Sequence, residues 1–300
     1  MLREYHKEQA ATARAIYTQS RTPDADAEDW NAALRSARKS IGEAMRASDY
    51  LRDVSAALLI SGEHARIFRH ILAPPLSQDQ LALFYPAWKK PTEKPGGPKS
   101  KPASAGAVAT AVQERRVATL TPWLTSGRAP TRRELERLYW SVSPLLANQQ
   151  FSTVQRNRLA KIQESSITAL LDANGWIRLP SSLLDTKAAL PLKHYMHKTR
   201  FATATTSPQE VDIALGLKNT VVLAMECKVT NDVTNSIKRV NDILKKSSAW
   251  KKHWGSFVRT AAVLQGVIAD KDVMRLLDDD VEVFWSHDLP RFEQWISKSI

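Results

Sequence analysis

Two short apolar runs separated by a polar turn constrain the C-terminal half of this sequence most strongly. Residues 212–217 and 220–228 are rich in aliphatic and β-branched side chains, and Lys218 and Asn219 between them are typical of a turn. Two runs of this length and composition around a short turn predict a β-hairpin. We therefore expect the chain to build a sheet around this hairpin.

Charged side chains stand where the apolar residues of the predicted hairpin stop. Because side chains alternate between the two faces of a strand, Glu226 and Lys228 share one face of the second strand. Cys227 points to the opposite face and is expected to be a small buried residue. In the first strand Glu210 and Asp212 share a face. The hairpin is thus predicted to bring acidic side chains and one lysine to a single point.

This grouping has the composition of a metal-dependent site that hydrolyses phosphodiesters. Mg²⁺ prefers carboxylate and carbonyl oxygens, and a bound metal ion lowers the pKa of water and polarises the phosphoryl oxygen. Asp212 and Glu226 are candidate metal ligands together with the backbone carbonyl of Cys227. Glu210 is a further candidate, for a second metal ion or for outer contacts. Lys228 would orient or deprotonate the attacking water and offset charge in the transition state. The alternative is a solvated cross-strand pair, because such a motif also arises by chance.

The segments around the hairpin predict a mixed α/β arrangement. Apolar residues at helical spacing predict a helix after the hairpin, capped by Asp232 or Thr234 and ended by Gly255. The other predicted elements are helices at 148–173, 270–278 and from about 288, and strands at 194–203, 260–266 and 281–285. The order is therefore helix, three strands, helix, strand, helix and strand, followed by one further helix.

This order and the acidic motif resemble the αβββαβ core of PD-(D/E)XK (restriction-endonuclease-like) enzymes. Residues 226–241, 262–267 and 284–289 are similar, more specifically, to the XamI-like family of type II restriction endonucleases. The resemblance implies Mg²⁺-dependent double-strand cleavage at a short specific site, beside a methyltransferase that protects host DNA. Asp212, Glu226 and Lys228 lie where that family's catalytic residues fall. Val211 replaces the proline of the motif's name, at a position that varies across the superfamily.

Polar and basic residues just after the predicted site are candidates for DNA contacts. Asparagine pairs with adenine and arginine with guanine in the major groove, while lysine and helix N-termini bind phosphates. The alternative is a capped and solvated helix face. The candidates are Asn231, Asn235, Ser236, Lys238 and Arg239.

Composition favours a polyanionic partner without identifying it. The chain has 300 residues, of which 43% are hydrophobic, and a formal net charge of +12. It can bury a full core and has room for two domains. The basic balance suits nucleic acid, although ribosomal and membrane-surface proteins share it. A single cysteine excludes an intrachain disulfide and a cysteine zinc cluster. With no signal pattern and no apolar run long enough for a bilayer, a cytoplasmic location is expected.

The N-terminal part is expected to be mainly helical. Residues 1–85 are predicted to form a helical region, in which Trp30 and Ile41 mark the apolar face of one helix. A second helix is marked by Leu51, Val54, Leu58 and Leu59. Residues 86–107 form a basic, Pro/Gly-rich linker or DNA arm. Residues 108–300 carry helices leading into the nuclease domain, whose core is 148–300. A capping box at Thr131 starts one of these helices.

The resulting hypothesis is a Mg²⁺-dependent type II restriction endonuclease that cuts double-stranded DNA. A homodimer on a short palindromic site is expected, because two-fold DNA would match a two-fold protein. A structure-specific repair nuclease or resolvase with the same core is one alternative. A non-catalytic basic DNA-binding protein is another.

Overall fold

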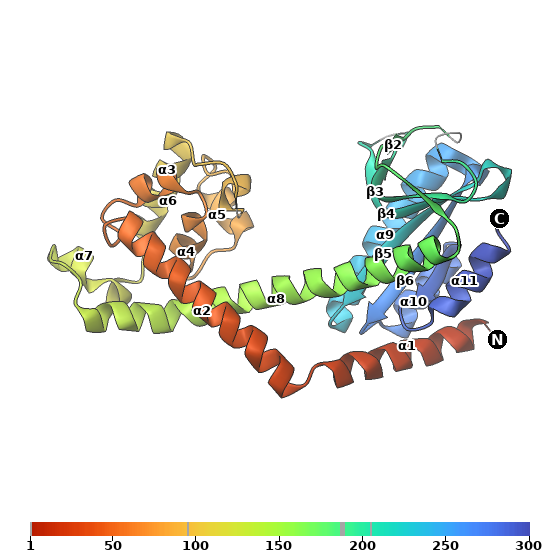
Figure 1. Cartoon of the computed structure of the whole chain (residues 1–300). Coiled ribbons are helices and arrows are strands. Elements are labelled where there is room, and N and C mark those ends of the chain that lie inside the picture. The colour runs from red at the N-terminus through yellow and green to blue at the C-terminus, as the bar shows by residue number, and fades with distance from the viewer. Residues whose placement is uncertain (1, 95, 187–189, 205) are drawn as a thin grey trace. The chain divides into compact units, whose positions relative to one another are not determined.

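The chain folds into two compact units (Figure 1). The computed structural model describes residues 2–94, 96–186, 190–204 and 206–300. The sheet unit comprises Met1–Thr22 and Gln155–Ile300, and the helical unit comprises Pro23–Val154. The long helix α8 (Arg132–Ala173) contributes residues to both. Residue 95 of the predicted basic segment, and residues 187–189 and 205 of the region after it, lie outside the described residues.

A mixed seven-stranded sheet forms the centre of the sheet unit, counted over the residues that the structure describes. The strand order is β1-β3-β4-β5-β6-β7, and β2 also pairs with β3. Neighbours β3, β4 and β5 are antiparallel, whereas β5, β6 and β7 are parallel. The strands are β1 (Ile177–Leu179), β2 (Leu183–Leu184), β3 (His194–Phe201), β4 (Gln209–Gly216), β5 (Val222–Thr230), β6 (Val258–Gly266) and β7 (Val281–Trp285).

Helices cover both faces of the sheet. The C-terminal part of α8 and α11 (Leu289–Ser297) pack on one face, where Leu223 and Met225 are buried. Helices α1 (Leu2–Ser20), α9 (Val233–Trp254) and α10 (Asp270–Asp278) pack on the other, where Ala224 and Leu264 are buried. Successive residues of β5 therefore enter opposite cores, which is the alternation predicted for this strand.

The connection from β5 into α9 follows the local chemistry of its residues. The side chain of Asp232 accepts a hydrogen bond from the amide of Asn235 and caps the first turn of α9, as predicted. The helix ends at Trp254, because Gly255 takes a left-handed φ of 59°. At the end of β6, Gly266 has a φ of 93°, and a Cβ there would collide with the carbonyl oxygen of Thr230. Only glycine fits this close approach of two strand ends.

The helical unit packs its helices around a separate apolar core. Ile41 is buried as predicted, but Leu59 is 41% exposed. The prediction was wrong for Leu59 because Val54 and Leu58 turn the inner face of α3 toward the core. Leu51 is buried ahead of that helix rather than within it. The elements are α2 (Pro23–Ala47), α3 (Val54–Ile60), α4 (His64–His70), α5 (Gln78–Phe84), η1 (Lys90–Glu93), α6 (Pro102–Arg115), η2 (Ala118–Leu120) and α7 (Pro122–Ser126).

Helix α8 is longer than predicted. The capping box at Thr131 is present, since its side chain and that of Glu134 exchange hydrogen bonds with each other's amides. The helix then continues for 42 residues through Pro144, where two separate helices were expected. Proline removes one backbone hydrogen bond from a helix interior. Val142 and Leu146 are buried in the same core on either side of it, so packing holds the helix together across this position.

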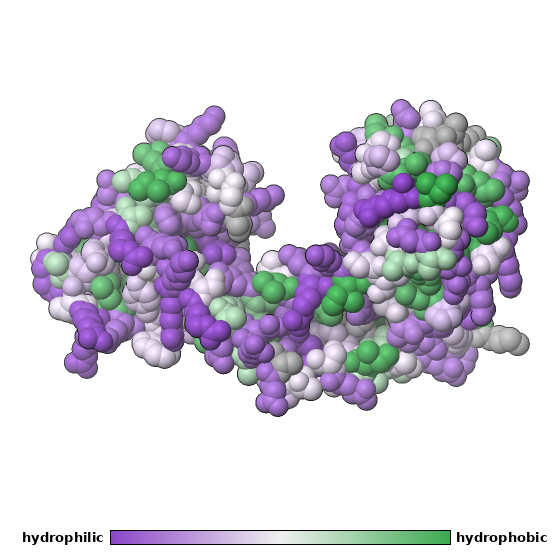
Figure 2. Space-filling model, in the orientation of Figure 1, coloured by the Kyte–Doolittle hydropathy of each residue, from purple (hydrophilic) through white to green (hydrophobic). Residues whose placement is uncertain are grey.

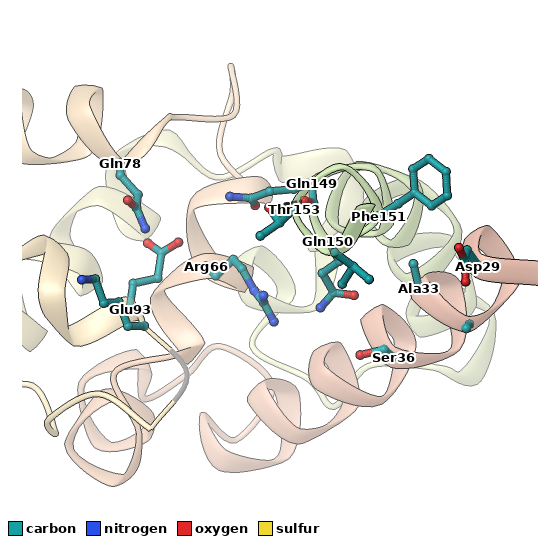
Figure 3. Close-up of a pocket in the computed structure, with 13 residues that line it drawn as sticks. Asp29, Ala33, Ser36, Arg66, Gln78, Glu93, Gln149, Gln150, Phe151 and Thr153 are labelled. Carbon is teal, nitrogen blue, oxygen red and sulfur yellow. Dashed lines mark hydrogen bonds between the residues drawn. The ribbon is translucent and has the colours of Figure 1, made fainter. Parts of the chain in front are cut away.

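The helical unit contains a cavity of about 570 Å³ lined by residues of α2, α4, α5, η1 and α8 (Figure 3). Its wall includes Glu93, whose carboxylate forms a buried, bidentate ion pair with Arg69. Figure 3 shows Arg66 and Gln150 facing one another in this cavity. The predicted catalytic residues belong to the sheet unit and do not line this cavity.

Hydrophilic residues dominate the visible surface of each unit, and hydrophobic ones appear there in small separate groups (Figure 2). Within the described residues, no helix combines the length and the hydropathy needed to cross a lipid bilayer.

Candidate active site

Strands β4 and β5 separate beyond Ile213, and this opening brings the predicted site residues together. The ladder between the two strands begins at Ile213, so Asp212 lies outside it. The amide of Cys227 donates to Asp212 Oδ2 over 2.8 Å in place of a ladder bond. The Lys228 ammonium donates to Glu226 Oε2 over 2.5 Å and to Asp212 Oδ2 over 3.5 Å. Asp212, Glu226 and Lys228 thus form one cluster.

The environment favours the ionised form of Asp212. Burial acts to raise the pKa of this carboxyl, but the charge of Lys228 and hydrogen bonds from Lys198 and the Cys227 amide outweigh it. The pKa of Asp212 therefore lies below its ordinary value. The side chain is also only 17% exposed, so its oxygens face a defined set of partners.

Glu226 is in a more costly position than Asp212. Its side chain is fully buried, and burial raises its pKa despite the nearby ammonium groups. Lys246 of α9 donates to the same Oε2 over 2.9 Å. Burial acts to lower the pKa of Lys228, but the negative charges of Glu226 and Asp212 have the larger effect and raise it. In this arrangement Lys228 is an ammonium group, suited to offsetting negative charge rather than removing a proton.

Two further residues extend the cluster toward α8. The Lys198 ammonium of β3 donates to Asp212 Oδ1 over 2.7 Å and to Glu164 Oε1 over 2.6 Å. The other oxygen of Glu164 contacts His197 Nε2 at 2.8 Å. Burial opposes the charge on Lys198, but its two carboxylate partners outweigh this effect and raise its pKa.

The backbone of β3 and β4 changes its facing at this point. Tyr195 and Ile213 pack on the α8 side of the sheet, whereas Phe201 and Val211 pack on the α9 side. Tyr195 and Phe201 are six residues apart in β3, and Val211 and Ile213 are two apart in β4. Regular alternation would therefore place both residues of each strand on the same face. Lys198, which lies between Tyr195 and Phe201, has a left-handed φ of 56°. This conformation reverses the alternation within β3 and directs Lys198 into the cluster.

Sequence reasoning missed Glu164, Lys198 and Lys246 as parts of the site. Lys246 carried a usable signal, because it lies four residues after Asp242 on one face of a helix that follows the motif. Glu164 and Lys198 carried none: a glutamate in an amphipathic helix and a lysine in a strand are ordinary surface residues. Only the left-handed backbone at Lys198 brings these two together.

Glu210 and Cys227 contribute backbone groups rather than side chains. The Glu210 side chain is exposed, and its carbonyl oxygen accepts a hydrogen bond from Lys246 over 2.9 Å. The Cys227 thiol is buried in the α8-side core, which raises its pKa well above the ordinary value. In an antiparallel ladder the amide and carbonyl of one residue face the same neighbour. The Cys227 carbonyl therefore faces the edge on which Asp212 lies.

The residues predicted to contact DNA differ in their exposure. Asn231 and Lys238 are exposed, and Asn235 and Arg239 are half-buried. The side-chain Nδ2 of Asn235 donates to the side chains of Asn231 and Asp232, so this residue also holds the start of α9. Ser236 is fully buried and its hydroxyl donates to Asp272, which places it inside the fold.

The site supplies oxygen donors of the kind Mg²⁺ prefers. Glu226 Oε1 is buried and has no hydrogen-bond partner among the described residues, an arrangement that costs free energy unless a donor or cation satisfies it. The Asp212 carboxylate and the Cys227 carbonyl face the same opening. Over the described ranges, no three His, Cys, Asp or Glu side chains form a metal-ligand group. The oxygen donors that this opening offers to a cation are therefore two carboxylates, of Asp212 and Glu226, and the Cys227 carbonyl.

Comparison with known proteins identifies the family. The model of the XamI restriction endonuclease family matches residues 49–285, which include every residue of the cluster. This chain belongs to the XamI restriction endonuclease family. The family assignment made from the motif and its neighbouring runs is thereby confirmed. A type II restriction enzyme, XamI of Xanthomonas campestris pv. amaranthicola, is 28% identical over 190 residues, which are 63% of this chain and 66% of the relative.

The chain thus spans slightly less than two thirds of the XamI enzyme in that alignment. A crystal structure of protein VC1899 from Vibrio cholerae covers 93% of this chain and 58% of its own, with a TM-score of 0.33 and 11% identity. That likeness is too low to bear on the fold.

Proposed function

We propose that this chain is a type II restriction endonuclease that makes Mg²⁺-dependent double-strand breaks at a short, specific, palindromic DNA sequence. The observation that carries the proposal is the convergence of Asp212, Glu226 and Lys228 at the opening between β4 and β5. Membership of a restriction endonuclease family supports it independently.

The chemistry follows from the charges in this cluster. Asp212, Glu226 and the Cys227 carbonyl would hold the magnesium ion, with Glu210 as a candidate outer contact. The bound ion would supply an acidified water and a polarised phosphoryl oxygen. Lys228, as an ammonium group, would orient the attacking water and offset the charge that builds on the phosphate. Lys246 would hold Glu226 in place from α9.

We also propose that the sheet unit is a PD-(D/E)XK domain. The order α8, β3-β4-β5, α9, β6 agrees with the αβββαβ core of that superfamily, and the motif lies within β4 and β5, beside the point where their ladder stops. Under this proposal the core occupies residues 148–300, and α1 packs on its sheet, so the predicted helical region at 1–85 is divided between the two units. Residues 86–107, predicted as a basic linker or DNA arm, lie inside the helical unit with Trp88 and Glu93 buried, so we propose their exposed lysines as DNA contacts and not the segment as a linker between domains.

Double-stranded DNA is the proposed substrate, encountered in the cytoplasm. The net charge of +12 would attract the phosphate backbone. Asn231, Asn235, Lys238 and Arg239 lie near the start of α9 and are the proposed DNA contacts. Ser236 would support that helix from within. A homodimer would present one active site to each strand of a palindrome. Pairing with a DNA methyltransferase would protect the host's own sites.

The test is cleavage of unmethylated phage DNA with Mg²⁺, followed by sequencing of the fragment ends. The wild type is compared with Lys228→Met and with Lys271→Met, which removes an exposed lysine of α10 in the same unit. Discrete fragments with one shared end sequence are expected from the wild type and the Lys271 variant. Loss of at least roughly a hundredfold in rate is expected for Lys228→Met.

Other outcomes point to the alternatives. Cleavage of branched DNA but not of linear duplex would indicate a structure-specific nuclease. DNA binding without cleavage by any of the three proteins would indicate a non-catalytic DNA-binding protein.

A further inference from the structure

Lys198 takes an unusual path into the active-site cluster. It lies within β3 opposite Asp212, between the register pairs His197–Ile213 and Thr199–Val211. Its φ of 56° is a left-handed conformation that non-glycine residues rarely adopt in a strand. Such conformations persist where the surroundings impose them, and they are concentrated at functional sites. The surroundings here are the two carboxylates that the ammonium bridges.

The position of the Lys198 ammonium resembles that of a bound cation. It lies 2.6 Å from Glu164 Oε1 and 2.7 Å from Asp212 Oδ1, so two carboxylate oxygens from different elements converge on one positive charge. Asp212 presents its other oxygen to the Cys227 amide and to Lys228. Lys198 therefore occupies the outer side of a carboxylate whose inner side faces the proposed metal position.

The Lys198 ammonium contributes one of the positive charges that balance the carboxylates of the cluster. Among the described residues, the lysine ammonium groups and carboxylates joined directly to one another within 3.5 Å carry three negative and three positive charges, and Arg178 reaches them only through His197, which contacts Glu164. The groups joined directly are Asp212, Glu226 and Glu164 against Lys198, Lys228 and Lys246. A neutral cluster attracts a divalent cation less than a negative one does. Removal of one ammonium would leave a net negative site.

Lys198 is also the lysine best placed to leave the cluster. Its side chain is 54% exposed, whereas those of Lys228 and Lys246 are 12% and 16% exposed. Burial holds the last two in place, but the Lys198 ammonium can reach solvent by rotation of its own side chain.

We propose that Lys198 acts as a tethered counter-cation, holding a position between Asp212 and Glu164 that Mg²⁺ would otherwise fill and so limiting how much metal the enzyme binds. This inference rests on the proposed function, because it assumes that the cluster takes up magnesium. A purely structural ion pair would stabilise β3 and α8 without any effect of Lys198 on metal binding. Removing the charge of Lys198 should therefore change Mg²⁺ affinity if it is a counter-cation, but only protein stability if it is a structural ion pair.

The test is calorimetric titration of the DNA-free protein with Mg²⁺. Lys198→Met keeps the length of the side chain and removes its charge. We expect it to bind an additional Mg²⁺ ion or to bind Mg²⁺ at least roughly tenfold more tightly. That is the size of the repulsion between a divalent and a monovalent cation a few ångströms apart, even in a water-like dielectric. Lys198→Arg, which keeps the charge, and the Lys271→Met control should match the wild type.

A thermal shift adds a second measurement. In EDTA, Lys198→Met should melt at a lower temperature than the wild type, because Asp212 and Glu164 lose their shared partner. Saturating Mg²⁺ should then raise the melting temperature of the variant by more than it raises that of the wild type. The inference is overturned if Lys198→Met binds Mg²⁺ with unchanged or weaker affinity and unchanged stoichiometry. If the wild type still cuts DNA specifically, only this inference fails. If it neither binds Mg²⁺ nor cuts DNA, the proposed function fails as well.

Discussion

The two carboxylates of the site should respond in opposite ways to neutralisation. A carboxyl whose pKa falls on folding stabilises the folded state at neutral pH, whereas one whose pKa rises destabilises it when ionised. Asp212 belongs to the first kind and Glu226 to the second. We therefore expect Asp212→Asn to lower the stability of the metal-free protein. Glu226→Gln should leave that stability unchanged or increase it.

The contacts set the size of each effect. An asparagine side chain at position 212 could still accept from the Cys227 amide, but it would lose the charge-assisted bond from Lys198, whose strength is reduced by solvent. The loss is about 1 to 2 kcal/mol. A glutamine at position 226 removes a charge that is fully buried. Lys228 keeps Asp212 as a partner, and Lys246 keeps the carbonyl of Glu210, so neither ammonium is isolated. A change between about 0 and 1 kcal/mol in favour of folding is expected.

Scanning calorimetry in EDTA near neutral pH would measure both variants beside the wild type. Each should also fail to cut DNA when Mg²⁺ is restored, because each lacks one proposed metal ligand. Stability and activity would then be separated at a single site, as expected where a functional charge is held at a cost. The reasoning is refuted if both variants shift the transition in the same direction by similar amounts.

Two further predictions concern regions away from the site. His6 Nδ1 accepts from the Trp285 indole, and burial lowers the pKa of this histidine from 6.5 to about 4. The unfolded state therefore binds a proton at a higher pH than the folded state does. As the pH is lowered from about 6.5 to 4, the free energy of unfolding should fall by roughly 1 to 2 kcal/mol, a range reduced for partial solvent screening of His6. His6→Asn should flatten this part of a melting-versus-pH profile, and a wild type with no slope there would contradict the assignment. In the helical unit, replacing exposed lysines of residues 86–107 by glutamine should weaken DNA binding. The slope of log affinity against log salt concentration should fall by up to about 0.9 for each phosphate contact that is lost. An unchanged slope would mean that these lysines make no phosphate contacts. The lysines to be replaced are Lys89, Lys94, Lys99 and Lys101; Lys90 is also exposed but pairs with Asp79 and is kept.

The elements nearest the motif were the most predictable from sequence. Strand β5, helix α9 and strand β6 combine strong periodicity with clear end signals, such as the cap at Asp232 and the stop at Gly255. Local chemistry and tertiary packing agree in these segments, so patterns in the sequence suffice. The pairing of Asp212 with Glu226 and Lys228 could likewise be predicted from alternation along two adjacent strands.

The parts that could not be predicted depend on packing that no local pattern records. Two separate helices were expected from the capping box at Thr131 and the periodicity of 148–173, but buried residues on both sides of Pro144 keep α8 continuous. Leu58 and Leu59 were both assigned to the apolar face of one helix, but adjacent helical residues point in different directions and only Leu58 is buried. Glu164 reaches the site only because α8 packs on the sheet, and Lys198 only because its backbone is left-handed. Such contacts follow from the assembled fold.

The burial of Cys227 gives the protein a natural chemical reporter. It is the single cysteine of the sequence, and its amide binds Asp212 at the centre of the cluster. A thiol reagent can reach its sulfur only when this part of the sheet opens, because the side chain is packed in the α8-side core. The rate of alkylation therefore measures local opening of the active site in the unmodified chain, without an introduced label. Magnesium or DNA that holds the strands closed would slow that reaction, and its kinetics would read out ligand binding directly.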